Sequence, residues 1–353
     1  MSRFLKEQYQ KLEAYTPGEQ PRDMVYIKLN TNESPFPPAP EVVAAMTAEQ
    51  VENLRLYSDP TAKGLKEKLA GLYGVSAEQI FLTNGSDDIL NFAFMAWGQK
   101  GAIFPDITYG FYPVFAELHG VEYTEIPLNS SFSINKEDYL NKNKLIVIAN
   151  PNAPTGISMG VETIEEILRT NPDCPVVIDE AYVDFGGVSC YKLTERYENL
   201  LVVRTFSKSR CLAGGRLGYA IGAKGLIEDL EKIKYSTNPY NINRLTMLLG
   251  EATVDAEAYY QEKCREIMRV RGQTAERLKA LGFTVLPSDA NFLFAKSEKI
   301  SGETLYSELK KRGILVRHFT KERIKDFNRI TIGTEAQMQA FCTAVAAILE
   351  EQV

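Results

Sequence analysis

Residues 176–182 read Val-Val-Ile-Asp-Glu-Ala-Tyr, and residues 201–208 read Leu-Val-Val-Arg-Thr-Phe-Ser-Lys. Each stretch is a short apolar run that ends in polar or charged side chains. Similar runs occur at Ile80–Thr83, Ala102–Phe104 and Leu145–Ala149. Helix-like segments such as Asp87–Trp97 separate several of them. Continuous apolar strands that alternate with helices are typical of a mainly parallel sheet covered on both faces, so the sequence predicts an α/β fold.

The alternating pattern ends near residue 250, and the chain is expected to divide there. Residues 1–40 are rich in proline, which favours an extended arm that packs against a small domain or a partner subunit. Residues 41–250 would form a large α/β/α domain. Residues 251–353, which begin with a long amphipathic helix over 255–281, would form a smaller α+β domain.

Further elements are predicted from local signals. Asp59-Pro60 is expected to open a helix whose apolar face follows at helical spacing. In the C-terminal part the expected strands are Phe283–Leu286, Phe292–Ala295, Ile314–Arg317 and Arg329–Ile332. The expected helices are Thr304–Arg312 and Glu335–Glu350.

The composition narrows the function classes. The chain has 353 residues, with 40 basic and 46 acidic side chains and a formal net charge of -6. This balance argues against binding to nucleic acid or to an anionic membrane. Five cysteines without a C-x-x-C motif and two histidines without H-E-x-x-H argue against a metal site. Because no apolar run approaches the length of a membrane span and no apolar leader is present, we expect a cytoplasmic protein.

Functional side chains in an α/β sheet gather at the carboxyl ends of strands. After Ile80–Thr83 comes Asn-Gly-Ser-Asp-Asp, where Gly85 permits close approach of a ligand. The backbone amides of Ser86 and Asp87 would open a helix and point at an anion. An ordinary capped helix would also explain these residues.

Two other strand ends carry charge. Asp179 and Glu180 follow a buried strand, where a carboxylate needs either a cation or several hydrogen-bond donors. A helix cap or an internal ion pair is the structural alternative. Lys208 follows another buried strand, just after the hydroxyls of Thr205 and Ser207. Such a lysine is either a solvated surface residue or a desolvated amine able to form a Schiff base.

These signals together are the parts needed to hold pyridoxal 5'-phosphate. The phosphate group needs the helix amides and an arginine, and Arg216 follows Lys208 by eight positions. The ring nitrogen needs a carboxylate, for which Asp179 is the candidate. The aldehyde needs the lysine. The rigid loop Asn150–Gly156, with its two prolines and two asparagines, lies at a further strand end.

A series of motifs extends this pattern over nearly the whole chain. They are Tyr15-Thr-Pro-Gly18, Leu29-Asn-Thr-Asn-Glu-Ser-Pro35, Leu56-Tyr-Ser-Asp-Pro60, Asn84-Gly-Ser-Asp87, Thr108-Tyr-Gly110, Pro151-Asn-Ala-Pro-Thr-Gly156, Asp179-Glu-Ala-Tyr182, Ser207-Lys208 and Arg329-Ile-Thr-Ile-Gly333. With these motifs the chain resembles the fold-type-I pyridoxal-phosphate aminotransferases of classes I and II, and within them the histidinol-phosphate aminotransferases.

The resemblance implies a role for each matching residue around the cofactor. Lys208 is implied to bind the cofactor covalently and to move a proton between Cα and C4'. Asp179 would pair with the ring nitrogen, Tyr182 would hydrogen-bond the phenolic oxygen, and Tyr109 would stack on the ring. The residues implied to hold the phosphate are Gly85, Ser86, Asp87 through its backbone, Thr205, Ser207 and Arg216.

The resemblance also implies a homodimer with shared active sites. Tyr57 would reach the phosphate in the partner's site. Arg329 would bind the substrate α-carboxylate, with Arg317 as a second cation or an exposed strand-end charge. Tyr15 of the partner subunit would form one wall of the substrate site, and Asn32 is a further candidate substrate-binding residue.

Two positions depart from the family pattern. The family's asparagine before Pro-Thr-Gly is replaced here by Ala153, so either Asn152 takes over its contact with the cofactor or Tyr182 acts alone. Ser58 stands where proline is common in the segment that crosses the dimer.

The activity implied by the resemblance is transamination between L-glutamate and imidazole-acetol phosphate, which gives L-histidinol phosphate and 2-oxoglutarate. Its partners would be small molecules. The alternatives are an aromatic-amino-acid aminotransferase, a threonine-phosphate decarboxylase and a non-catalytic regulator that binds pyridoxal phosphate. The intact Lys208, Asp179 and Arg216 disfavour the regulator.

Overall fold

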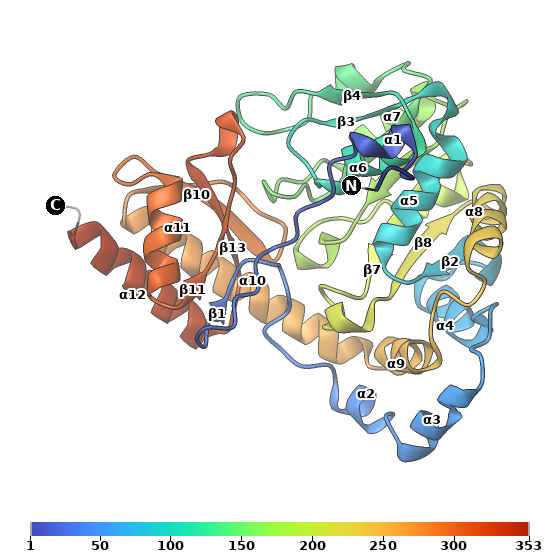
Figure 1. Ribbon diagram of the computed structural model, residues 1–353, viewed down its shortest axis with the longest axis horizontal. Coiled ribbons are helices and arrows are strands. Elements are labelled where there is room, and N and C mark those ends of the chain that lie inside the picture. The colour runs from blue at the N-terminus through green and yellow to red at the C-terminus, as the bar shows by residue number, and fades with distance from the viewer. Residues whose placement is uncertain (1, 352–353) are drawn as a thin grey trace.

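The computed structural model describes residues 2–351, and the larger part of the chain is built on a seven-stranded sheet (Figure 1). The strands lie in the order β2-β8-β7-β6-β5-β3-β4. Their bounds are Ile80–Thr83 (β2), Ala102–Pro105 (β3), Tyr123–Ile126 (β4), Leu145–Ala149 (β5), Val176–Asp179 (β6), Leu200–Thr205 (β7) and Gly218–Gly222 (β8). β8 is antiparallel to both of its neighbours, and the other neighbouring pairs are parallel. The predicted mainly parallel sheet is confirmed.

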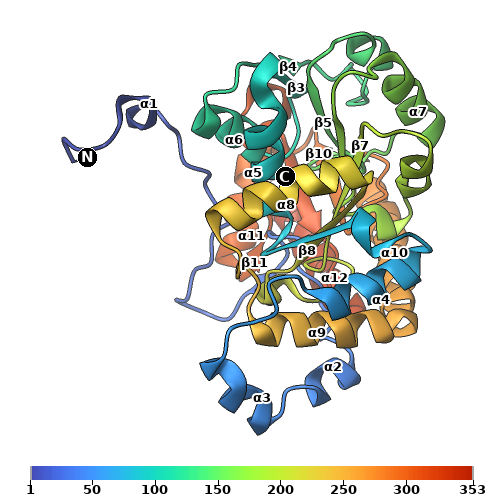
Figure 2. The same cartoon turned by 90° about the vertical axis from the view of Figure 1, so that its right-hand side faces the viewer.

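Helices cover both faces of this sheet (Figure 2). One face packs against α5 (Ser86–Trp97), α6 (Phe111–His119) and α8 (Lys224–Thr237). The other face packs against α4 (Lys63–Tyr73), α7 (Val161–Thr170) and α9 (Arg244–Asp255). Side chains of successive strand residues point to opposite faces of the sheet. Phe81 therefore packs with the first set of helices and Leu82 with the second. This is the predicted α/β/α layering.

The sequence did not predict strands β4 and β8. β4 lies at the edge of the sheet, and its central residues Thr124 and Glu125 are exposed, so it lacks an apolar run. β8 begins and ends with glycine, which weakens the strand signal. A Cβ atom on Gly218 would lie 2.3 Å from the amide nitrogen of Ser86. The close approach of β8 to the start of α5 therefore requires glycine at position 218.

A second sheet lies in the C-terminal part, in the antiparallel order β12-β13-β10-β9. Its elements are α10 (Glu257–Ala280), β9 (Phe283–Val285), β10 (Phe292–Ser297), α11 (Gly302–Lys311), β12 (Arg317–His318), β13 (Phe327–Thr331) and α12 (Glu335–Glu351). Helix α10 bridges the two parts, since Tyr260 packs in the core beside α4 and α9 and Ile267 packs in the C-terminal core. The predicted division at residue 250 falls inside α9 and stays a prediction.

The N-terminal arm runs between the two sheets (Figure 1). It was predicted to be an extended arm, but it contains the short elements α1 (Glu7–Gln10) and β1 (Ile27–Lys28). It leads into α2 (Pro40–Ala44) and α3 (Ala48–Glu52). β1 pairs in parallel with β11 (Ile314–Leu315). The single strand predicted over 314–317 is therefore split, because β11 joins the arm while β12 joins the C-terminal sheet.

Helix α4 begins at Lys63 rather than at the predicted Pro60. Ala62 adopts the left-handed conformation, with φ of 48°, and interrupts helical geometry. The Asp59 carboxylate accepts hydrogen bonds from the backbone amides of Thr61 (2.9 Å) and Lys63 (3.1 Å), so it caps the turn that precedes the helix. Within residues 2–351, no helix is both long and apolar enough to cross a membrane.

Candidate active site

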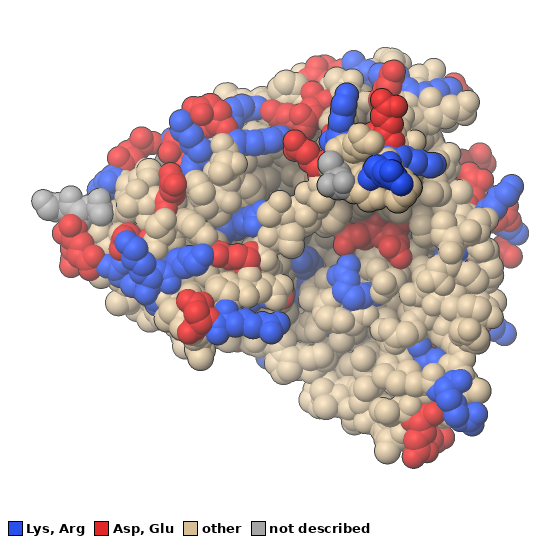
Figure 3. All heavy atoms as spheres, viewed as in Figure 1, with Lys and Arg blue, Asp and Glu red and all other residues tan. Residues whose placement is uncertain are grey.

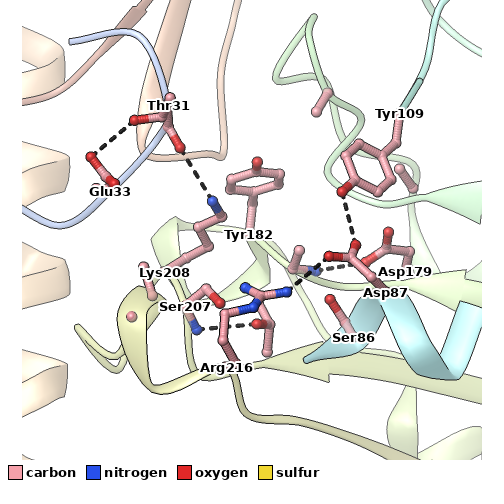
Figure 4. A pocket seen from close by; sticks show the side chains of 16 residues that line it. Thr31, Glu33, Ser86, Asp87, Tyr109, Asp179, Tyr182, Ser207, Lys208 and Arg216 are labelled. Carbon is pink, nitrogen blue, oxygen red and sulfur yellow. Dashed lines mark hydrogen bonds and ion pairs between the residues drawn. The ribbon is translucent and has the colours of Figure 1, made fainter. Parts of the chain in front are cut away.

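A cavity of about 310 Å³ opens where strands β5, β6 and β7 end, and the N-terminal arm faces it (Figure 4). The strand ends Ala149, Asp179 and Thr205 line it together. The predicted cofactor residues in its lining are Ser86, Asp87, Tyr109, Asp179, Tyr182, Thr205, Ser207, Lys208 and Arg216. Residues far apart in the sequence meet here because neighbouring parallel strands end at one edge of the sheet.

One side of the cavity has the features of an anion site. Helix α5 begins at Ser86, so its first backbone amides point out of the helix end toward the cavity. Gly85 has a φ of 91°, and a Cβ atom there would lie 2.6 Å from Nη2 of Arg216. Glycine at 85 thus lets the guanidinium approach the helix N-terminus. An anion bound between them would meet both a positive charge and amide donors.

The Asp87 side chain organises the same side of the cavity. Its Oδ1 accepts a hydrogen bond from the Tyr109 hydroxyl at 2.8 Å, and its Oδ2 pairs with Nη2 of Arg216 at 3.0 Å (Figure 4). From the sequence, Asp87 was expected to act through its backbone only. In the structure its carboxylate also holds the orientation of an aromatic ring and of a cation.

Asp179 is a buried carboxylate with hydrogen-bond donors but no cationic partner among the described residues. It is 5% exposed, and it accepts hydrogen bonds from the Tyr112 hydroxyl at 2.9 Å and from the Ala181 amide at 3.2 Å. Burial raises the pKa of Asp179 to about 6. A cationic ligand group would offset this cost, as the protonated ring nitrogen of pyridoxal phosphate would. Tyr112 was not singled out from the sequence, since it reads as an apolar helix residue.

The amine of Lys208 faces the N-terminal arm across the cavity (Figure 4). Its Nζ donates to the carbonyl oxygen of Thr31 at 3.4 Å and lies 5.8 Å from the centre of the Tyr182 ring. Glu33 also lines the cavity and pairs with Lys28 at 2.7 Å. The sequence did not predict Thr31 or Glu33 as site residues, because their place depends on the pairing of the arm with β11.

A buried ion network supports the loops that carry Asp179 and Lys208. Arg204 on β7 is 4% exposed and pairs with Glu180 at 3.2 Å and with Asp184. Asp184 also accepts a hydrogen bond from the hydroxyl of Ser209, the residue after Lys208. The end of β6 and the lysine loop are thus tied to the same guanidinium. Glu180 belongs to this network rather than to the cavity lining.

The two asparagines of the loop 150–156 stabilise the loop itself. Asn150 bonds both the amide and the carbonyl of Met159. Asn152 donates to the Ile107 carbonyl at 2.9 Å, and its Oδ1 accepts from the Thr108 hydroxyl at 2.8 Å. Ala153 lines the cavity, whereas Asn152 does not. The structure therefore does not bring the predicted cofactor residue Asn152 to the others.

A second cavity, of about 670 Å³, adjoins the first and shares Thr31, Tyr109, Ala153, Tyr182 and Lys208 with it. Figure 3 shows this face of the molecule hollowed between the two sheets. The predicted substrate residues Tyr15, Asn32, Arg317 and Arg329 line it.

Two arginines stand opposite each other in this second cavity. Arg317 on β12 pairs in register with Arg329 on β13. Arg329 donates to the carbonyl oxygen of Asn30 at 3.1 Å, its Nε has no partner among the described residues, and burial lowers its pKa. Within residues 2–351 neither guanidinium pairs with a carboxylate. Adjacent cations without an acid partner favour an anionic ligand.

The two predicted dimer residues lie in different places. Tyr15 stacks on Phe111 of the same chain, with ring centres 4.1 Å apart, so the chain's own Tyr15 occupies the position expected for Tyr15 of the partner subunit. Tyr57 lines neither of these cavities. It is 79% exposed and stacks on Tyr240, with ring centres 4.5 Å apart.

Comparison with known proteins identifies the family. The family model described as aminotransferase class I and II matches residues 25–345. The chain belongs to the class I and II aminotransferases. The predicted enzyme class is confirmed, and the matched range of this aminotransferase spans both sheets.

Relatives and solved structures agree with this assignment. The chain is 47% identical to a histidinol-phosphate aminotransferase of Brachyspira hyodysenteriae, over 99% of this chain and 100% of that one. It is 49% identical to one from a Marinomonas species, with the same coverage. It also superposes, with a TM-score of 0.90 and 22% identity, on the histidinol-phosphate aminotransferase of Sinorhizobium meliloti in complex with pyridoxal-5'-phosphate, covering 100% and 99% of the two chains. The predicted fold class is confirmed.

We predict that Asp179→Asn stabilises the cofactor-free aminotransferase at neutral pH. Asparagine keeps the shape of the side chain and can bond Tyr112, but it carries no charge. A carboxyl group with a pKa of about 6 in the folded chain and about 3.9 in the unfolded chain costs roughly 2–3 kcal/mol once ionised. Because the folded-state pKa is raised, this cost is absent below about pH 4 and is complete above the folded-state pKa.

Thermal unfolding of the cofactor-free chain between pH 4 and pH 8 checks this prediction. The variant should match the wild type at pH 4 and unfold a few degrees higher at pH 8. Asp173→Asn, which removes an exposed carboxylate, is the control and should change neither value. An unfolding temperature at pH 8 equal to or below that of the wild type would contradict the account of Asp179.

Proposed function

We propose that this aminotransferase uses pyridoxal 5'-phosphate to transfer the amino group of L-glutamate to imidazole-acetol phosphate, which gives L-histidinol phosphate and 2-oxoglutarate. The relatives at 45–49% identity over nearly the whole chain support this substrate pair. The observation that carries the proposal is the pair of facing arginines in a cavity that adjoins the one lined by Lys208 and Asp179.

The residues of the first cavity fit the cofactor group by group. Bound pyridoxal phosphate supplies an aldehyde that condenses with amines and a ring that withdraws electrons. Arg216 and the amides at the start of α5 would bind its phosphate, with the hydroxyls of Thr205 and Ser207 as further donors. Asp179 would accept a hydrogen bond from the protonated ring nitrogen, which keeps that nitrogen protonated.

Lys208 is proposed as the residue that holds the cofactor and as the base of the reaction. With substrate bound, the Nζ of Lys208 would be placed to take the proton from the substrate Cα and to return it to C4' of the cofactor. The carbonyl oxygen of Thr31 keeps this amine at the arm side of the cavity.

The arginine pair is proposed to bind the anionic end of either substrate. A guanidinium can bind a carboxylate or a phosphate with two parallel hydrogen bonds. Arg329 is fixed by the carbonyl of Asn30, which leaves its Nε available. Arg317 is more exposed and is held by the carbonyls of Thr16 and Pro17 on the arm. A phosphate, with three terminal oxygens, can engage both arginines more readily than a carboxylate.

A half-reaction screen tests the proposed function. The cofactor-loaded protein is mixed separately with L-histidinol phosphate, L-glutamate, L-phenylalanine and L-tyrosine, and the loss of the absorbance of the lysine-bound cofactor is followed. Histidinol phosphate and glutamate should react. If phenylalanine or tyrosine is preferred to histidinol phosphate by tenfold or more in kcat/KM, the activity is that of an aromatic aminotransferase. Release of carbon dioxide from threonine phosphate would instead identify a decarboxylase.

We predict that Arg329→Ala weakens both half-reactions, whereas Arg317→Ala weakens that of histidinol phosphate more than that of glutamate. Loss of a two-pronged contact to a buried anion costs on the order of 2–5 kcal/mol, or about 30-fold to several thousand-fold in kcat/KM. Arg269→Ala is the control, since Arg269 pairs with Glu335 at 2.8 Å and neither residue lines this cavity. Equal losses for both substrates in Arg317→Ala would contradict a phosphate-specific role.

We further propose a homodimer in which Tyr57 reaches the partner's site. Tyr57 is exposed, but its backbone is fixed, since Arg244 donates to its carbonyl at 3.0 Å and the Ser58 hydroxyl donates to the Ile242 carbonyl at 2.7 Å. The surface over α2 and α3 carries apolar as well as charged side chains (Figure 3). Its exposed apolar residues are Val43, Met46, Val51, Leu54 and Leu56. Such a patch is typical of an interface between copies. The cytoplasmic location stays a prediction.

Mixing two variants tests the shared site. Tyr57→Ala and Lys208→Ala are exchanged by mild dissociation and reassociation. Each mixed dimer then holds one site with both residues intact, so the activity should rise above the sum of the separate variants. Reassociated samples of each variant alone are the controls. Mass measurement verifies that the subunits have exchanged. If the activity then does not rise, each chain builds its site alone.

A further inference from the structure

Asn32 connects the N-terminal arm, the C-terminal sheet and the first cavity. It is 1% exposed and adopts a φ of 56°, a conformation that asparagine tolerates better than most residues. Its backbone amide nitrogen donates to Oγ1 of Thr331 at 3.0 Å, and its backbone carbonyl oxygen accepts from Nδ2 of Asn291 at 3.0 Å. Its side chain lies between Thr331 and Tyr182, with both contacts at 2.9 Å.

The hydrogen bonds of this chain run in one direction. The Thr331 hydroxyl accepts from the backbone of Asn32 and donates its own hydrogen to Asn32 Oδ1. Asn32 Nδ2 then donates to the Tyr182 hydroxyl oxygen. If the amide were reversed, the Thr331 hydroxyl hydrogen would face an NH₂ group and would have no acceptor among the described residues. The orientation of the amide is therefore fixed by Thr331.

This direction determines where the Tyr182 hydrogen points. A hydroxyl that accepts a hydrogen bond on one side keeps its own hydrogen free for another acceptor. Tyr182 lines both cavities, and within residues 2–351 its hydroxyl has no second partner. The neighbouring Ala153 offers no hydrogen-bonding side chain. The hydroxyl hydrogen of Tyr182 is thus available to donate a hydrogen bond to a ligand on this side of the cavity.

We propose that Asn32 is a positioning residue that keeps the Tyr182 hydroxyl hydrogen turned into the cavity, toward the phenolic oxygen of the bound cofactor. This inference rests on the proposed binding of pyridoxal phosphate. Because Thr331 and Arg329 share strand β13, the strand that carries a proposed substrate-binding arginine also orients the donor to the cofactor. The arm thereby links substrate binding to the cofactor ring.

The donor affects the acidity of the lysine-bound cofactor. Deprotonation of the linking nitrogen leaves more negative charge on the phenolic oxygen, so a donor to that oxygen stabilises the deprotonated form. Loss of the donor should raise the midpoint of the cofactor's absorption titration by roughly one pH unit. The other charged or titratable groups near Tyr182 are Lys208, Arg329, Tyr109, Tyr15 and Tyr112, together with Asp179, which lines the same cavity. All of them stay unchanged in the test.

Asn32→Asp is the test variant. An ionised carboxylate accepts from both neighbours, so the Tyr182 hydroxyl would turn its hydrogen away from the cavity. The titration midpoint of the cofactor-loaded protein should rise about as far as in Tyr182→Phe. Asn328→Asp is the matched control, because Asn328 is an equally buried asparagine on β13 that donates to the Gly302 carbonyl away from both cavities. It should lower the unfolding temperature without moving the midpoint.

A double variant separates orientation from charge. If Asn32 acts through Tyr182, Asn32→Asp should add no shift in the Tyr182→Phe background. A shift of the same size in that background would show that the new charge acts directly and would overturn the proposal, as would an unchanged midpoint in Asn32→Asp alone.

Thr331 variants keep the proposal testable if Asn32→Asp does not fold. Thr331→Val removes the hydroxyl that fixes the amide, so the midpoint should rise, whereas Thr331→Ser should behave as the wild type. Equal midpoints in both Thr331 variants would contradict the proposal. If the wild-type protein shows no cofactor absorbance with added pyridoxal phosphate, the proposed function itself fails, which is a distinct result.

Discussion

The cost of burying charge without a protein counter-charge governs the design of this site. Among the described residues, Asp179 is buried with two hydrogen-bond donors and no cation, and the partly buried Arg329 lies beside another arginine without an acid partner. Elsewhere the chain balances its buried charges, as Arg204 does with Glu180 and Asp184. A ligand with a cationic ring nitrogen and an anionic substrate would supply the missing partners at the two places where the fold leaves them out.

The N-terminal arm joins the two halves of the site. The larger sheet supplies the lysine, the carboxylate and the anion site, and the C-terminal sheet supplies the arginines. The arm pairs with β11, presents the Thr31 carbonyl to Lys208, and places Asn32 between Thr331 and Tyr182. Each of these contacts uses the backbone or a short polar side chain. A small displacement of the arm would therefore change the surroundings of both the cofactor and the substrate.

The sequence predicted what local signals determine. An apolar strand that ends in a charged residue fixes both the strand and the place of Asp179 and Lys208, because parallel strand ends converge. The sequence could not show that Asn152 stabilises its own loop or that Tyr112 bonds Asp179, since these contacts join segments that are distant in the sequence. The role of Asn32 depends on the pairing of a two-residue strand, for which the sequence has no periodic signal.

The covalent attachment site tests the central claim most directly. Reduction of the cofactor-loaded protein with borohydride fixes the label, and trypsin should then cleave after Arg204 and Arg210 but not after a modified Lys208. The account predicts that the pyridoxyl group is found on the single peptide of residues 205–210. A label on any other lysine, or a peptide cleaved at an unmodified Lys208, would contradict the placement of the cofactor between Asp179 and Arg216.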